Sequence, residues 1–225
     1  MNEVFNSPFF GISICILTYQ IGRYLNRKLK SPLANPMLIA MILIIAFLKI
    51  FNISYDQFNQ GGQFISLFLA PATACLGVSV YKQLDVLKKN ILPILLGCTV
   101  GSLTSIVSVY CLCKLFKLDE KFMISLIPKS VTTPIGISIT EQHGGMVPIT
   151  VLAILVTGLI GAIFAPLMIR IFRVKNPVAA GIAIGTSSHA LGTSKAVEIG
   201  EIEGAMSSLA IGIAGLVTVF FSIFL

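Results

Sequence analysis

Two apolar stretches in the second half of the chain carry polar and cationic residues at their centres. Residues 122–140 contain Lys129, Ser130, Thr132 and Thr133. Residues 178–196 contain Ser187, Ser188, His189, Gly192, Thr193, Ser194 and Lys195. Unsatisfied backbone is too costly to leave facing lipid, so such interruptions persist only where protein buries them or where they line a polar cavity. Paired interruptions are typical of transporter binding sites, and we expect these residues, except Lys195, to surround a small solute. Lys195 is expected to serve coupling or charge pairing.

The chemistry expected at both interruptions is anion binding by the start of a helix. We expect Thr133 to cap a half-helix whose first position is Pro134, and Gly192-Thr193-Ser194 to form the matching start. Free amides and the positive end of the helix dipole attract anions, and Lys129 adds a full positive charge. Two such starts would suit a small carboxylate. The alternative is that serine, threonine and glycine there only allow close helix packing.

The ionisable residues of these stretches each allow two interpretations. A lysine at membrane depth costs roughly 3 kcal/mol on insertion scales, unless it lies near an interface, as Lys195 could. His189 could relay protons or could simply bridge two helices. Glu141 and Glu198 close the two stretches, where they could serve coupling, pair with lysine or lie at an interface.

Enzyme chemistry, a cofactor and a metal are not expected. Ser187 and His189 lie close in sequence, but no G-x-S-x-G elbow accompanies them. The five cysteines all lie within apolar runs, which favours small core residues over a metal site or a disulfide framework.

Composition requires lipid as the solvent. Hydrophobic residues make up 56% of the 225 residues, charged residues only 11%, and mean hydropathy is +0.94. The net charge of +7 does not indicate a nucleic-acid partner, because the cations cluster at the ends of apolar segments. That clustering follows the positive-inside pattern of membrane proteins.

The fold class predicted is an all-α integral membrane protein with six spans and two interrupted re-entrant hairpins. The spans are expected at residues 8–25, 32–51, 62–81 (kinked at Pro71), 91–113, 147–169 and 204–225. They form a single polytopic domain, residues 1–225, in which four N-terminal spans (1–113) precede repeat unit one (122–169) and repeat unit two (178–225).

Charge and an internal repeat both favour hairpins over full spans. Placing the basic clusters inside leaves residues 114–121 outside and Arg170 inside, so residues 122–140 must begin and end outside. A shift of 57 residues aligns Ser130 with Ser187 and Glu141 with Glu198. Two units that enter from opposite faces would form an inverted repeat.

The chain resembles the LrgB/CidB family of bacterial membrane proteins. The matching text is Ala70-Pro-Ala-Thr-Ala74, Ile127-Pro-Lys-Ser-Val-Thr-Thr-Pro134, Val156-Thr-Gly-Leu-Ile-Gly161, Ser187-Ser-His-Ala-Leu-Gly-Thr193 and Gly204-Ala-Met-Ser-Ser-Leu-Ala210. The resemblance covers essentially the whole chain and implies a multi-pass protein of the bacterial cytoplasmic membrane.

Two functions are implied by this resemblance. One is carriage of small monocarboxylates such as pyruvate, lactate or glycolate, as in the similar plastid glycolate/glycerate translocator. The other is antiholin-like regulation of murein hydrolase activity and autolysis. Expected partners are the lipid bilayer, a small organic anion, a small membrane protein of the LrgA/CidA type and further copies of the chain. The interrupted, cation-bearing segments favour the carrier, because a lesion-forming protein has no evident need for them. Coupling of this carriage to protons is part of the hypothesis.

Overall fold

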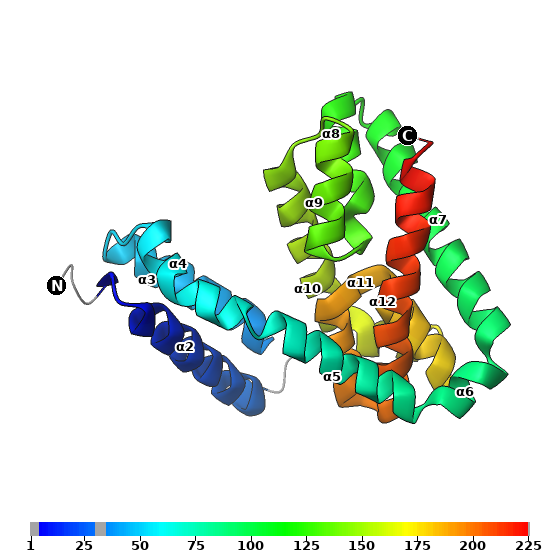
Figure 1. Cartoon of the computed structure of the whole chain (residues 1–225), viewed down its shortest axis with the longest axis horizontal. Helices are drawn as coiled ribbons and strands as arrows, with labels where there is room; N and C mark the ends of the chain where they lie inside the picture. The colour runs from blue at the N-terminus through cyan, green and yellow to red at the C-terminus, as the bar shows by residue number, and fades with distance from the viewer. Residues whose placement is uncertain (1–4, 30–34, 225) are drawn as a thin grey trace. The chain divides into compact units, whose positions relative to one another are not determined.

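The computed structural model describes residues 5–29 and 35–224, and within these ranges the chain consists of helices joined by turns (Figure 1). The all-helical class predicted from the sequence is confirmed. The chain divides into two compact units, Met1–Cys75 and Leu76–Leu225, with the division inside helix α5 (Leu69–Lys82).

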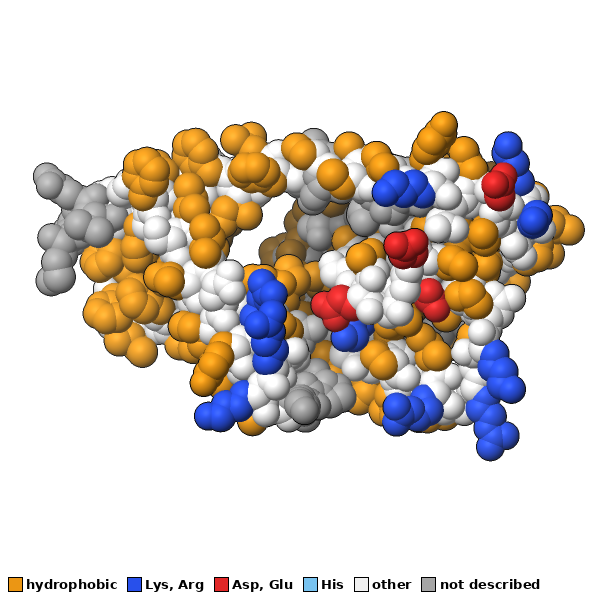
Figure 2. Space-filling model, turned by 90° about the horizontal axis from the view of Figure 1, so that it is seen from below, with side chains coloured by type: hydrophobic (Ala, Val, Ile, Leu, Met, Phe, Trp, Pro, Cys, Tyr) orange, Lys and Arg blue, Asp and Glu red, His pale blue; other side chains and the backbone are white. Residues whose placement is uncertain are grey.

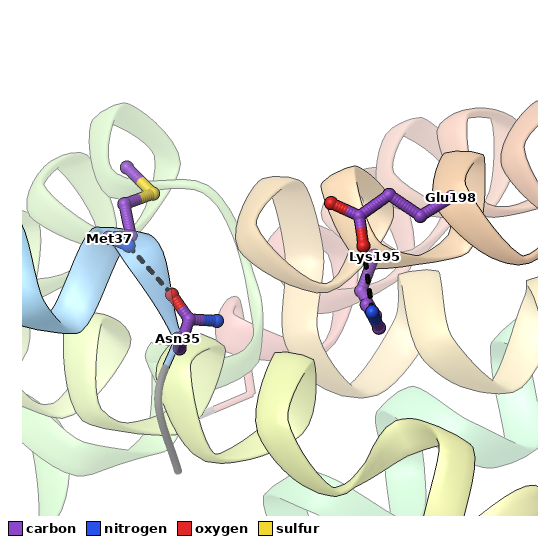
Figure 3. Close-up of polar contacts among 4 residues, drawn as sticks. All are labelled: Asn35, Met37, Lys195 and Glu198. Atoms are coloured by element: carbon purple, nitrogen blue, oxygen red, sulfur yellow. Dashed lines mark hydrogen bonds and ion pairs between the residues drawn. The ribbon is translucent and has the colours of Figure 1, made fainter. Parts of the chain in front are cut away.

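The first unit contains helices α2 (Pro8–Leu29), α3 (Pro36–Ile50) and α4 (Tyr55–Ser66). Asn35 caps α3, because its Oδ1 accepts a hydrogen bond of 2.9 Å from the Met37 amide (Figure 3). Gly11 of α2 and Gly61 of α4 let these two helices touch backbone to backbone. A Cβ built on Gly11 would lie 2.8 Å from the Gly61 Cα.

The span expected at residues 62–81 is wrong in its boundaries. The chain forms two helices there, α4 and α5, with the break at Leu67 and Phe68 rather than a kink at Pro71. Pro71 lies in the first turn of α5, where its missing N–H has no intrahelical partner to lose. Helix α4 also begins earlier than the expected span, at Tyr55, because Ser54 and Gln57 form a reciprocal capping box.

The second unit contains a short α6 (Leu84–Lys89) and then α7 (Ile91–Leu115), α10 (Val147–Ile171) and α12 (Glu201–Ser222). These last three are long and apolar enough to cross a membrane, by length and composition. Helix α11 (Pro177–Ile199) packs between α10, α12 and α7. A core of Ile94, Cys98, Ile182, Met206 and Ala210 joins α7, α11 and α12.

The first interrupted segment folds as a hairpin beside α10. It consists of α8 (Glu120–Leu126), the 3-10 turn η1 (Ile127–Ser130) and α9 (Thr133–Gln142). The Met146 amide donates to Ser125 Oγ at 2.7 Å, and Thr150 Oγ1 donates to the Ser125 carbonyl at 2.9 Å. Thr150 Oγ1 is also 2.8 Å from Thr140 Oγ1. These bonds place the end of α9 beside α8, so the chain doubles back between them.

The second interrupted segment, α11, also doubles back, at His189. This residue has φ 41° and ψ −137°, which breaks the helix into two arms. Ile184 on the first arm and Ala196 on the second pack in one buried cluster. Gly181 lies against Glu203, and Gly204 lies against Val197, so both arms meet the beginning of α12.

Each long helix that follows a hairpin contacts the other hairpin near its break. A Cβ built on Gly158 of α10 would lie 2.7 Å from His189 Cε1, and one on Gly215 of α12 would lie 2.8 Å from Ile135 Cδ1. The two glycines are 57 positions apart, the offset that aligns the two halves in sequence. The same offset pairs the breaks, Thr132 with His189.

Candidate functional site

A pocket of about 1210 Å³ lies within the second unit. Its walls are one face of α7, one face of α10, the first arm of α11 and the turn η1. Lys129 is the charged residue among the described residues that line it. The other polar lining residues are Asn90, Thr104, Ser105, Ser108, Ser130, Thr157, Asn176, Thr186, Ser187 and Ser188.

Lys129 is held by hydroxyl groups from two elements. Its Nζ donates to Ser105 Oγ on α7 at 3.3 Å and to Ser130 Oγ at 3.2 Å. The two hydroxyls are themselves 2.9 Å apart. Among the described residues the ion pair found is Lys195 with Glu198, so no carboxylate there neutralises Lys129. A half-buried cation without a counter-charge is a natural partner for an anion.

Four predicted site residues reach this pocket: Lys129 and Ser130 from the first hairpin, and Ser187 and Ser188 from the second. The equivalent positions Ser130 and Ser187 therefore line one cavity. Ser187 Oγ lies 3.0 Å from Ser188 Oγ and donates to the Ala183 carbonyl at 2.7 Å. Ser188 packs against Gly161 of α10, where any side chain would collide with it.

The predicted cap at Thr133 is wrong by one residue. Thr132 is the N-cap of α9, with an extended backbone, and its side chain makes no capping bond. Pro134 is therefore the second helical residue rather than the first, although it still lies in the first turn. Neither threonine lines the pocket, which meets the arm before the break rather than the helix start after it.

The helix start predicted at Gly192-Thr193-Ser194 is also misplaced. The second arm of α11 follows directly on His189, so these residues lie inside the arm. Thr193 is buried, donates to the His189 carbonyl at 2.9 Å and lies 2.6 Å from Ser207 Oγ of α12. Gly192 packs against Ser188 and Ile184, and Ser194 is exposed and bonds within its own arm.

His189 lies outside the pocket lining and is buried against α10. Its Nε2 is 3.0 Å from the Ile154 carbonyl oxygen. Since that oxygen can only accept, Nε2 carries the hydrogen. The ring therefore bridges two helices at the break.

The residues predicted for coupling or charge pairing lie apart from the pocket. Lys195 Nζ is 2.7 Å from Glu198 Oε2, one turn along the same arm (Figure 3). Both side chains are partly or largely exposed, so this pair contributes little to stability. Glu141 is exposed near the end of α9.

Sequence reasoning missed the contribution of α7. Its pocket face is made by Val100 and a set of mostly small or hydroxyl residues: Pro93, Gly97, Gly101, Thr104, Ser105 and Ser108. These small or hydroxyl residues recur every three or four positions, which places them on one helical face. That spacing was visible in the sequence, but it reads equally well as a helix-packing stripe.

Comparison with known proteins then gives the family. The profile of the LrgB-like family matches residues 15–225. The chain belongs to the LrgB-like family. It is 42% identical over 214 residues to the antiholin-like protein LrgB of Bacillus mycoides (strain KBAB4), covering 95% of this chain and 93% of the relative.

The proteins of the same name from Bacillus cereus (strain B4264) and Bacillus anthracis (strain CDC 684 / NRRL 3495) are each 41% identical over the same coverage. No solved structure matches the chain. Membership in the LrgB-like family and the three long apolar helices together make this chain a membrane protein.

Proposed function

We propose that this LrgB-like protein is a carrier of small monocarboxylates, of the size class of pyruvate, lactate and glycolate. The observation that carries the proposal is Lys129, a cation without a described counter-charge that faces a large pocket among hydroxyl groups. A carboxylate accepts hydrogen bonds on both oxygens, so one ammonium group and neighbouring serines can hold it.

The charge of the pocket supports a monoanion. Lys129 is the one charged residue among the described lining residues, so a second carboxylate on the solute would lack a partner there. Ser105, Ser130 and Ser188 would then supply the neutral hydrogen-bond donors. Proton coupling is part of the proposal, with His189 as its candidate because it joins the hairpin break to α10.

We place the chain in the bacterial cytoplasmic membrane. Each hairpin is proposed to be re-entrant, so that it enters and leaves the bilayer on the same face. The doubling back of both segments supports this arrangement. Gly158 of α10 contacts the second hairpin, and Gly215 of α12 contacts the first. These reciprocal contacts at equivalent positions of the two repeats support an inverted repeat. We assign no enzymatic activity to the chain.

The second candidate function is antiholin-like regulation, which the names of the relatives favour. In this role the chain would act through a partner, such as a small LrgA/CidA-type membrane protein, or through self-association, without carrying a solute. Its determinants would then lie on lipid-facing or partner-facing surfaces rather than at Lys129.

Uptake of radiolabelled pyruvate, lactate and glycolate into proteoliposomes tests the carrier, with and without an LrgA/CidA-type protein. We expect saturable uptake that falls roughly 10–100-fold in Lys129→Ala, because one charge-assisted interaction is removed. The matched control is Lys121→Ala, an exposed lysine of α8 outside the pocket, which should retain uptake.

Two other results would reject the proposal. Absence of uptake by folded protein, with and without the partner, would favour the regulatory function. Equal losses in the two lysine variants would show that the pocket does not hold the anion. Autolysis of cells expressing Lys129→Ala adds a second measurement, since a pure regulator should tolerate this change.

A further inference from the structure

The geometry points to a water-filled access path that connects Lys129 with one face of the membrane only, the face at which α7 begins and α10 ends. This inference rests on the proposed carrier function and names the side from which the anion reaches its site. Its test measures solvent access rather than transport, so the two proposals can fail separately.

The pocket extends far along its helices. On α7 its lining runs from Pro93 to Ser108, about 22 Å at about 1.5 Å per residue. On α10 it runs from Thr157 to Ile169, about 18 Å, and it continues to Phe172 just after the helix. The hydrocarbon core of a bilayer is about 30 Å thick. The pocket lining extends from one end of these two helices past their middle.

The mouth of the pocket is placed by lining residues at the ends of three helices, α7, α10 and α11. The lining includes Asn90 just before α7, Phe172 just after α10 and Asn176 just before α11. Basic residues flank the same chain positions: Lys88 and Lys89 precede α7, and Arg170, Arg173 and Lys175 lie at the end of α10 and beyond it. Figure 2, which views the molecule from below, shows Lys and Arg side chains on the surface. By the positive-inside rule, the mouth of the pocket therefore lies at the cytoplasmic face.

The opposite end of the pocket is closed by apolar packing. Beyond Ser108, Val109 and Cys113 of α7 pack against Ile127 of η1, and all three are buried. Partly buried Ile106, Met123 and Leu126 surround them. Lys129 therefore lies between the pocket and this apolar cluster, which we call the seal. A carrier that is open to one face of the membrane has such an arrangement.

Cysteine labelling in membrane vesicles tests this path. Thr104→Cys and Ser108→Cys place thiols on the pocket face of α7. Val107→Cys is the matched control, because it has similar depth but an exposed side chain outside the lining. A membrane-impermeant methanethiosulfonate reagent is applied to inside-out and right-side-out vesicles, and peptide mass spectrometry measures each site, so the native cysteines can stay. Lys175→Cys and Lys117→Cys report the two faces.

We expect Thr104→Cys and Ser108→Cys to react about tenfold or more faster from the face that labels Lys175→Cys, since the reaction needs a hydrated thiolate. Val107→Cys should react slowly from both faces. Faster reaction from the Lys117 face would overturn the assigned side. Reaction no faster than at Val107→Cys would overturn the water-filled path and indicate a groove occupied by lipid.

Discussion

At the scale of single residues, the site depends on a cation that the fold holds without neutralising it. Lys129 belongs to a 3-10 turn that ends at the break of the first hairpin, and Ser105 reaches it from α7. Neutral hydroxyls orient the ammonium group but leave its charge available. A carboxylate neighbour would instead compete with the anion.

The first prediction concerns Ser105 as a positioning residue. In Ser105→Ala the Lys129 ammonium keeps Ser130 and loses one of its two hydroxyl partners. We expect the KM for monocarboxylate uptake to rise about 3–10-fold, the equivalent of one net hydrogen bond, with protein amount unchanged. The control is Ser108→Ala, whose hydroxyl bonds only to the Ser105 carbonyl. Equal effects in both variants would contradict the assignment.

The second prediction concerns close packing at Gly161. Its Cα hydrogen faces Ser188, and an added methyl group would collide with the Ser188 side chain. We expect Gly161→Ala to lower the free energy of unfolding by about 1–3 kcal/mol, as overpacking does. The matched change Gly212→Ala meets open space on α12 and should be neutral or stabilising by up to about 1 kcal/mol. Unfolding of the purified proteins in detergent measures both, and equal stability would refute the contact.

The individual residues show where sequence reasoning reached its limit. Lys129, Ser130, Ser187 and Ser188 could be chosen because polar residues inside apolar runs need a polar cavity. Thr193 satisfied the same rule, yet it bonds to Ser207 instead of lining the cavity. Which hydroxyl faces the cavity depends on where each helix breaks, and the positive φ of His189 was not readable from its residue type.

At the scale of elements, two hairpins and the helices that follow them define the second unit. Thr150 ties both arms of the first hairpin to α10, and Ser207 ties the second hairpin to α12. These two residues are 57 positions apart, as the repeat requires. The hairpin interruptions could be predicted from composition, whereas the boundary between α4 and α5 could not, because Leu67 and Phe68 carry no break signal.

The third prediction concerns the bonds of Thr150. Thr150→Val keeps the shape of the side chain but removes the bonds to Ser125 and Thr140. We expect the free energy of unfolding to fall by about 1 kcal/mol, since hydrogen bonds between membrane helices are individually modest. Thr99→Val serves as the control, because its hydroxyl bonds to the Leu95 carbonyl of its own helix. No difference between the variants would argue against a structural role for these bonds.

The fourth prediction concerns the face on which the first hairpin ends. If it re-enters, a cysteine at His143 should be labelled from the same side as one at Lys117 and from the side opposite to one at Lys175. Impermeant maleimide applied to vesicles of both orientations measures this. Labelling of His143→Cys together with Lys175→Cys would mean that the segment spans the membrane, and the re-entrant arrangement would then be rejected.

At the scale of the whole molecule, the charge pattern, the pocket and the apolar seal together describe one state of the proposed carrier. In the proposed orientation the basic clusters lie inside, and the pocket lining reaches the same ends of α7 and α10. Composition predicted a membrane protein, since 56% hydrophobic and only 11% charged residues suit lipid as the solvent, and the apolar segments predicted helices. It could not predict the pocket, because the packing of helix faces far apart in sequence decides its shape.

The central claim is that the chain carries the anion on a saturable site rather than opening a pore or only regulating others. Counterflow tests it most directly: proteoliposomes loaded with unlabelled lactate are diluted into a trace of labelled lactate. A carrier predicts transient accumulation of label above its equilibrium level, absent in Lys129→Ala and present in Lys121→Ala. Label that only rises to equilibrium, or does not enter, would contradict the account.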